Sequence, residues 1–286
     1  MHNLSVMGKL NSYGNFIKIE HTLFSFPIVL AGSFLAAGGI PPIYLLILIL
    51  TAAAGARTCA MGLNRLIDRK IDLANPRTRD RELPSGKIKL REAYLITGLG
   101  LGIYFASCYL ICSLVFYLSP VPLLVFIIYP YLKRVTPLCH FGVGLALAFA
   151  PLGGWLAVTC SFDNIMPAIL LALFTLFWVC GFDIIYATLD EKSDNKNRIY
   201  SMVSVYGRTR ALNVSAICHF LAFLSVAVFY ILEFRSVISG LVLILIGGLL
   251  YLEHKKSSNI DLAFFKINIL VGGSIFLFVI CGIYFS

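Results

Sequence analysis

Nine apolar segments, each near the length of a membrane-spanning helix, constrain this chain more than any other feature. A helix needs about 20 apolar residues to cross the hydrocarbon core of a bilayer. Charged residues make up only 13% of the 286 residues, and hydrophobic residues make up 59%. We therefore predict an all-α polytopic membrane protein with about nine transmembrane helices, which cover residues 22–40, 43–63, 93–112, 114–132, 141–160, 165–186, 211–232, 236–252 and 266–285.

Lysine and arginine are distributed unevenly between the two ends of these segments. Nine of them fall between residues 65 and 91, and others fall at 133–134, 192–210 and 255–266. With nine spans, all of these connections lie on one side, and the opposite connections contain only Arg235. Because positive residues mark the cytoplasmic side, we expect the N-terminus in the cytoplasm and the C-terminus outside, in a membrane of the bacterial inner (cytoplasmic) type.

The net charge of +9 follows from this bias. No basic stripe lies on a soluble domain, so we expect no nucleic-acid partner, and no feature indicates a protein partner. Residues 1–20 are polar and lack an apolar core followed by small residues, so we expect no cleaved signal.

The first acidic motif is Asn64-Arg-Leu-Ile-Asp68-Arg-Lys-Ile-Asp72. On a continuous helix, Arg57 and the three numbered residues of the motif share an arc of roughly 80°. Carboxylates beside lipid are costly and therefore indicate function, and pairs four residues apart suit a hard cation. We predict that Asp68 and Asp72 bind Mg²⁺, and that Asn64 completes the metal shell or binds a diphosphate.

Arg57 lies about two turns deeper than Asn64 on the predicted helix. A buried arginine needs an anionic partner, which is either an anionic group of a ligand in the cavity or Asp68 in an internal ion pair. The loop after the motif contains Arg77 and Arg81. Arginine suits phosphate oxygens, although a loop that only sets membrane topology would look the same.

The second acidic motif is Asp183-Ile-Ile-Tyr186-Ala-Thr-Leu-Asp190-Glu-Lys-Ser-Asp194. On a helix these four numbered residues again share a face of about 80°. We predict that Asp190 and Asp194 bind a second Mg²⁺. Tyr186 presents its ring either to the cavity, where it stabilises a cation, or to the membrane interface.

Four further basic residues are candidate ligands of a diphosphate: Lys133, Arg134, Lys192 and Arg198. Solvated loops or topology signals explain each of them equally well. The five histidines form no ligand pattern, and none is predicted to take part in catalysis.

The two motifs indicate an internal duplication. Asp68 and Asp190 are 122 residues apart, as are Asp72 and Asp194. Structural repeats in membrane proteins often place a site between the halves. We predict one integral-membrane domain over residues 1–286, with pseudo-repeated halves of roughly 20–140 and 141–286.

The chain resembles the UbiA superfamily of intramembrane prenyltransferases over essentially its whole length. Residues 64–86 resemble the first aspartate motif and loop of that family, and residues 183–194 resemble the second. The opening segment 17–27 is similar to the bacterial branch that prenylates 4-hydroxybenzoate. It is also similar to the branch of futalosine-type menaquinone synthesis, whose acceptor is 1,4-dihydroxy-6-naphthoate.

The resemblance implies helices around a central cavity that opens to the cytoplasm. It implies Mg²⁺-dependent transfer of a polyprenyl group from its diphosphate to an aromatic acid in quinone biosynthesis, of the ubiquinone or the menaquinone type. Asp183 or Asp190 would then orient or activate the acceptor, and Arg57 would bind its carboxylate. The alternatives within the family are haem O synthase and lipid prenyltransferases. The alternative from another class is a membrane transporter with an acidic ion site.

Overall fold

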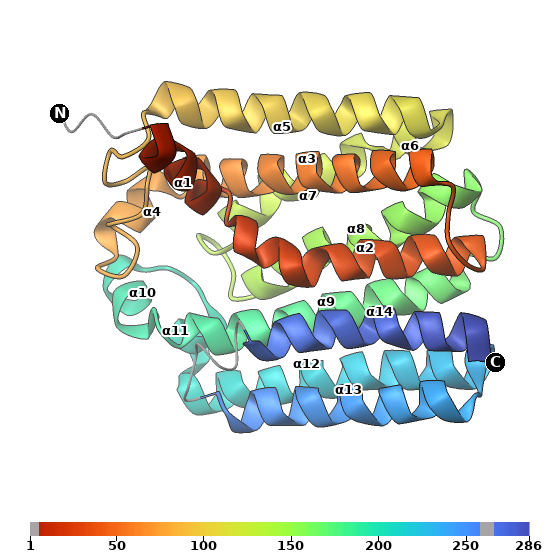
Figure 1. Ribbon diagram of the computed structural model, residues 1–286. Helices are drawn as coiled ribbons and strands as arrows, with labels where there is room; N and C mark the ends of the chain where they lie inside the picture. The colour runs from red at the N-terminus through yellow and green to blue at the C-terminus, as the bar shows by residue number, and fades with distance from the viewer. Residues whose placement is uncertain (1–5, 258–265, 286) are drawn as a thin grey trace.

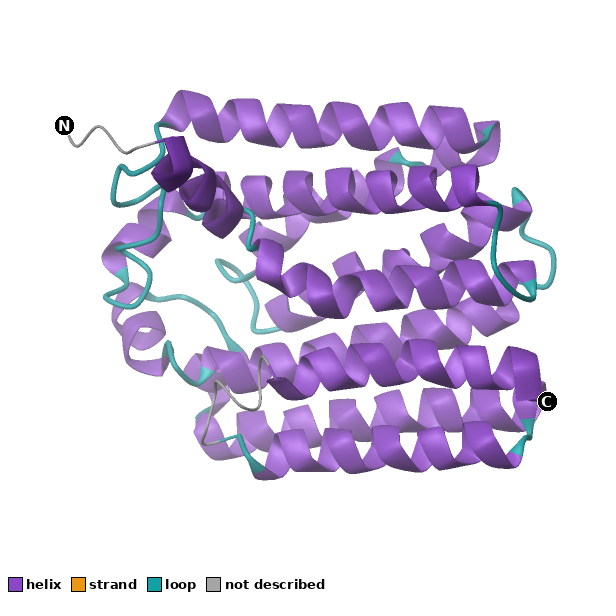
Figure 2. Ribbon diagram, in the orientation of Figure 1, coloured by secondary structure: helices purple, strands orange, loops and turns teal. Residues whose placement is uncertain are grey.

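The computed structural model describes residues 6–257 and 266–285, and within these ranges it contains helices and loops but no strand (Figure 2). The all-α prediction is confirmed. Residues 1–5 of the polar N-terminal segment lie outside the described residues. The described elements before the first polar loop are α1 (Val6–Phe16), a 3₁₀ turn (Ile19–His21), α2 (Thr22–Ala37), α3 (Ile43–Ile67) and α4 (Arg69–Ala74).

The remaining helices pack with α2 and α3 into one bundle (Figure 1). They are α5 (Leu90–Ile111), α6 (Ser113–Leu118), α7 (Pro120–Leu132), α8 (Cys139–Thr159), α9 (Met166–Ala187), α10 (Glu191–Asn197), α11 (Met202–Tyr206), α12 (Arg208–Phe229) with a π-turn at Tyr230–Phe234, α13 (Val237–Lys255) and α14 (Asn268–Phe285). In the described part of the chain, eight helical stretches are long and apolar enough to cross a membrane, and α2 adds a shorter one over Ser25–Ala37.

The observed helices differ from the predicted spans by a few residues at their ends, and two of these differences have a clear local cause. The first predicted span ends at Ala37 rather than at residue 40, because Gly38 adopts a left-handed φ of +60° that terminates the helix. The segment 114–132 is divided into α6 and α7 by a break at Ser119. Pro120 has no backbone N–H to continue the first helix, but its fixed φ suits the first position of the next.

The two acidic motifs lie at the same end of the bundle. Figure 1 shows α4, α10 and α11 gathered at the end where α1 lies, whereas α14 finishes at the opposite end. Both long polar connections, 75–89 and 188–201, therefore meet at one rim of the bundle, next to the last turns of α3 and α9.

Helix α9 forms the centre of the fold and packs most extensively against α8 and α12. Its residues Phe174, Trp178 and Phe182 follow one another at one-turn spacing and are all buried. Their rings are in contact, with centroid separations of 5.6 Å and 5.5 Å. Because this aromatic column is fixed on all sides, the last turn of α9, which carries Asp183 and Tyr186, projects from a rigid support.

Close helix packing at Gly144 gives a testable prediction about stability. A Cβ atom at this position of α8 would collide with the Leu176 carbonyl of α9, whereas a Cβ at Gly153 of the same helix would meet nothing. We expect Gly144→Ala to lower the unfolding free energy by about 1–3 kcal/mol, the usual cost of overpacking. Gly153→Ala is the matched control and should leave the melting temperature in detergent unchanged or higher. Equal melting temperatures for the two variants would contradict this packing.

Candidate functional site

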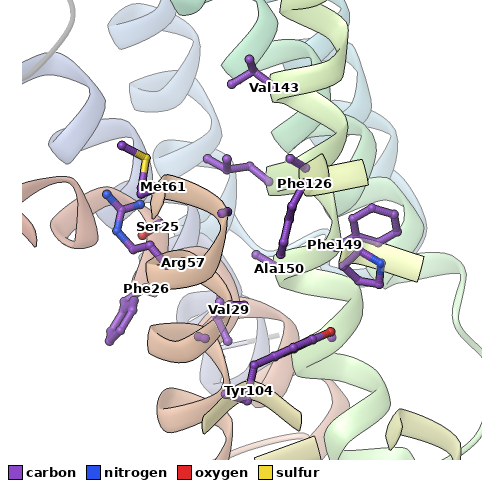
Figure 3. A pocket seen from close by; sticks show the side chains of 18 of the residues that line it. Ser25, Phe26, Val29, Arg57, Met61, Tyr104, Phe126, Val143, Phe149 and Ala150 are labelled. Atoms are coloured by element: carbon purple, nitrogen blue, oxygen red, sulfur yellow. The ribbon is translucent and has the colours of Figure 1, made fainter. Parts of the chain in front are cut away.

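A cavity of about 380 Å³ lies between α2, α3, α5, α7, α8 and α9. Most of its wall is apolar, with Val29, Ile49, Phe126 and Phe149 among the lining residues. Figure 3 shows Arg57 beside Met61 and Ser25 on one wall of the cavity, with Phe126 and Phe149 on the opposite side. Near the acidic motifs, the polar lining comes from the ends of α3 and α9 and from the loop after α4, and Arg57 lies deeper on α3; these residues are Arg57, Asn64, Arg65, Arg81, Asp183 and Tyr186.

The first acidic motif spans a break between two helices. The prediction of one continuous helix is wrong, because α3 ends at Ile67 and α4 begins at Arg69. The Asp72 N–H nevertheless donates to the Asp68 carbonyl at 2.8 Å, which preserves one helical turn across the break. Asp68 and Asp72 therefore remain one turn apart, and both are buried.

Asp68 is surrounded by donors from two helices. The Lys133 Nζ lies 2.5 Å from Oδ2, and the Arg134 Nη2 lies 3.5 Å from Oδ1. The Asn64 amide also donates to Oδ2, at 3.3 Å. Burial raises the pKa of Asp68, although the charge of Lys133 opposes the rise. The alternative of an Arg57–Asp68 ion pair is wrong, since Arg57 instead donates to the Lys18 carbonyl at 2.8 Å.

Asp72 lies between two arginines. The Arg81 Nη1 donates to Oδ1 at 2.8 Å, and the Arg65 Nη1 lies 3.6 Å from Oδ2. Arg65 is only 4% exposed and lines the cavity. Its charge alone indicated only membrane topology, but Arg65 and Asp72 are seven residues apart, close to two helical turns, and this spacing could have indicated the contact.

The second motif also crosses a helix break. Helix α9 ends at Ala187 and α10 begins at Glu191, so the predicted continuous helix is wrong here too. The Asp194 N–H donates to the Asp190 carbonyl at 2.7 Å, which keeps these two acids one turn apart. Burial raises the pKa of Asp194 to about 6.

The loop of the first motif reaches across to the second. The Arg77 Nε donates to Asp190 Oδ1 at 2.8 Å, and the Asn75 amide donates to the same oxygen at 2.7 Å. Burial alone would raise the pKa of Asp190, but the hydrogen bonds and charge of Arg77 hold it below its usual value. The two acidic motifs are thereby joined directly, and we call their four aspartates at 68, 72, 190 and 194 the acidic rim.

Tyr186 is the second contact of Arg77. The Arg77 Nη1 donates to the Tyr186 hydroxyl at 2.7 Å, and the guanidinium carbon lies 4.8 Å from the ring centroid. The cation that lies over this ring in the structure is therefore Arg77 itself. Tyr186 also lines the cavity, the first of the two locations considered for it from the sequence.

The structure does not bring Lys192 and Arg198 to the cavity. Both side chains are exposed, and neither lines the cavity. Arg198 follows α10 with a left-handed φ of +55°, which turns the chain away from the α10 axis. Five of the predicted diphosphate ligands contact Asp68, Asp72 or Asp190: Asn64, Arg77, Arg81, Lys133 and Arg134.

The carboxylates fit a magnesium ion that also takes ligands from a substrate. Within residues 6–257 and 266–285, no three acidic, histidine or cysteine side chains converge into a complete metal cage. Asp68 Oδ1 and Asp72 Oδ2 are buried oxygens that accept no hydrogen bond. Mg²⁺ is typically held by one or two carboxylates together with phosphate oxygens and water, so an incomplete set of hard oxygen ligands is the arrangement expected for it.

A histidine that the sequence analysis left without a role lies against Asp183. The His140 Nδ1 is 2.6 Å from Asp183 Oδ2, and the Met202 N–H donates to His140 Nε2 at 3.2 Å. The two side chains are 43 residues apart in the chain. No local spacing connects them, so only the tertiary structure reveals this contact.

The chain belongs to the UbiA prenyltransferase family, whose model matches residues 25–270. It is similar to the 4-hydroxybenzoate octaprenyltransferases of Aliivibrio salmonicida (strain LFI1238), at 32% identity over 177 residues, and of Nitrosomonas eutropha, at 34% over 197 residues. The first match covers 61% of this chain and 61% of the relative, so the chain spans about three fifths of that relative's length; the second covers 68% and 67%.

Solved structures show the same fold. The apo structure of a UbiA homolog from Aeropyrum pernix K1 has a TM-score of 0.81 at 29% identity, and the match covers 92% of this chain and 98% of that one. A UbiA homolog from Archaeoglobus fulgidus bound to GPP and Mg²⁺ has a TM-score of 0.74 at 19% identity, with 95% and 98% covered. The family and the apolar helices together define a multi-pass membrane protein.

Proposed function

We propose that this protein transfers a polyprenyl group from its diphosphate to an aromatic acid, with 4-hydroxybenzoate as the acceptor, in quinone biosynthesis of the ubiquinone type. The observation that carries the choice of an acid is Arg57. Its side chain lines the apolar cavity, its Nε is buried without a hydrogen bond, and no acidic side chain in the described part of the chain pairs with it. A carboxylate on the acceptor would supply the anionic partner that this buried cation needs.

The acidic rim suits a diphosphate bound through metal ions. Asp68 and Asp72 on one side, and Asp190 and Asp194 on the other, are the residues that would hold Mg²⁺. When bound, the metal neutralises charge on the departing diphosphate. The arginines and Lys133 that now contact these carboxylates are placed to turn toward phosphate oxygens, which guanidinium groups bind well. The apolar wall below the rim accommodates the prenyl chain.

The reaction then needs an acceptor ring next to the first carbon of the prenyl group. The C–O bond to the diphosphate breaks, a ring carbon of the acceptor attacks the allylic cation, and the ring loses a proton. Of the two candidate residues for orienting the acceptor, the geometry favours Asp183. It lines the cavity with 26% of its side chain exposed, whereas Asp190 is engaged with Arg77 and does not line the cavity.

Family membership and site geometry favour this reaction over transport. Acidic ion sites of transporters lie near the middle of the membrane. Here Asp68, Asp72 and Asp190 lie at one end of the bundle, and each contacts a lysine or an arginine. We place the protein in the bacterial inner membrane, with this end facing the cytoplasm.

Purified protein with Mg²⁺ and a labelled polyprenyl diphosphate tests the proposal. 4-Hydroxybenzoate and 1,4-dihydroxy-6-naphthoate are offered in parallel, and products are identified by mass. We expect prenylated 4-hydroxybenzoate that disappears with EDTA and returns with excess Mg²⁺. Product from the naphthoate alone would support prenyl transfer but would assign the enzyme to menaquinone synthesis. No product from either acceptor would contradict aromatic prenyl transfer.

A further inference from the structure

His140 is buried at the start of α8, between the cavity and the short helix α11. Its side chain is 4% exposed and lies within hydrogen-bond distance of Asp183 on α9 and of the backbone of Met202 on α11. Cys139 and Tyr200 strengthen the same junction, because the Cys139 thiol lies 3.5 Å from the Tyr200 carbonyl. The imidazole is therefore held from both sides, at the point where three helices meet.

The hydrogen bonds define the tautomer of this histidine. A backbone N–H can only donate, so the Met202 N–H requires a lone pair on His140 Nε2. The ring proton of the neutral imidazole then resides on Nδ1, which donates to Asp183 Oδ2 at 2.6 Å. A charged imidazolium would place a second N–H against the Met202 N–H. The arrangement thus directs the Nδ1 proton of His140 toward the Asp183 carboxylate.

We propose that His140 is a positioning residue, which fixes the orientation of the Asp183 carboxylate toward the aromatic acceptor. The inference rests on the proposed function, because it gives Asp183 a role toward the acceptor. A carboxylate held at one oxygen by a buried donor cannot rotate freely, and its remaining surface faces the cavity. Catalytic groups act efficiently when neighbouring residues lock their rotamers.

The anchor on the far side of His140 is itself immobilised. The Tyr200 N–H donates to the Lys133 carbonyl at 2.7 Å, which ties the segment before α11 to the end of α7. Ser204 stabilises the same turn, since its hydroxyl donates to the Ile199 carbonyl at 2.7 Å. Movement of Met202, and with it of His140, is thereby restricted by contacts that do not involve Asp183.

Two rates separate a positioning role from a purely structural one. The first is transfer to 4-hydroxybenzoate, and the second is release of diphosphate without acceptor, in which water attacks the allylic cation to give prenyl alcohol and a proton. Both are measured for His140→Ala, His140→Asn and the control Ser204→Ala. The asparagine amide supplies an N–H near the Nδ1 position, whereas alanine supplies no donor. Ser204→Ala loosens the α11 turn without touching Asp183.

His140→Ala is expected to lower kcat for transfer by about 10²-fold, the scale of positioned acid–base groups, and to retain diphosphate release. His140→Asn should recover most of the transfer rate. Ser204→Ala loosens the anchor but keeps the imidazole donor, so it should lower the transfer rate much less than His140→Ala does. In an Asp183→Asn background, His140→Ala should have no further effect, because residues that act through one another are not additive.

Three results would overturn the role of His140. They are an unchanged transfer rate in His140→Ala, a parallel loss of both rates that His140→Asn does not restore, or an equal further loss in the Asp183→Asn background. If His140→Ala does not fold, His140→Gln replaces it, because its amide extends toward the Nε2 position and leaves Asp183 without its donor. A wild-type protein that prenylates no aromatic acceptor would instead refute the proposed function.

Discussion

Asp72→Asn is expected to abolish prenyl transfer, with a fall in kcat/KM of at least about 10³-fold. Its carboxylate is buried between Arg65 and Arg81, and its Oδ2 accepts no hydrogen bond. The amide removes the negative charge that a metal ion requires and directs an NH₂ group toward a guanidinium. Initial rates at several Mg²⁺ concentrations measure the effect, and excess Mg²⁺ should not restore activity.

Asp80→Asn is the matched control for this substitution. Asp80 belongs to the same loop and lies 3.9 Å from Arg79, but 83% of its side chain is exposed. Neutralising it should leave kcat/KM unchanged, because exposed ion pairs contribute little. Comparable losses in both variants would show that net charge at the rim, rather than a metal ligand at Asp72, governs activity. Full activity in Asp72→Asn would contradict the assigned site.

Arg57→Ala is the second large effect that we expect, and it should act on the acceptor alone. Removing a charged hydrogen-bond partner costs about 1.5–3 kcal/mol, which corresponds to an increase in acceptor KM of roughly 10- to 150-fold. The KM for the prenyl diphosphate should change little, since Arg57 lies deeper in the cavity than the acidic rim. Steady-state kinetics with each substrate varied in turn separates the two parameters.

An acceptor analogue without the carboxylate provides the control for Arg57. The wild-type protein should discriminate strongly between 4-hydroxybenzoate and 4-hydroxybenzyl alcohol, and this preference should disappear in Arg57→Ala. Arg57→Lys keeps the charge but loses the planar fork that pairs with a carboxylate. Its preference for the acid should therefore lie between those of the wild type and of Arg57→Ala. A preference for the acid that persists in Arg57→Ala would assign carboxylate recognition to another residue.

Local spacing predicted the parts of the site that lie within one helical turn. Asp68 with Asp72, and Asp190 with Asp194, are one turn apart as expected. The structure nevertheless interrupts the predicted helix in both motifs. The one-turn spacing survives each break because the i+4 backbone hydrogen bond is kept. The apolar segments similarly predicted the spans, while Gly38 and Pro120 determined where two of them end or divide.

Contacts between distant segments could not be predicted in this way. Arg77 contacts Asp190 across 113 residues, and His140 contacts Asp183 across 43. These pairs depend on how α8, α9 and the 75–89 loop meet at the rim, and no helical period relates them. The same limitation explains Lys192 and Arg198, whose charge suited a diphosphate but whose side chains are exposed and do not line the cavity.

We propose that the two acidic motifs jointly hold a metal-bound diphosphate above the apolar cavity. The most direct test of this proposal is a structure of the protein with an uncleavable prenyl thiodiphosphate and Mn²⁺, whose anomalous scattering locates the metal. We predict metal density between the Asp68/Asp72 pair and the Asp190/Asp194 pair, with the diphosphate beside it and the prenyl chain along the cavity wall. Metal or diphosphate bound away from these four carboxylates would contradict the account.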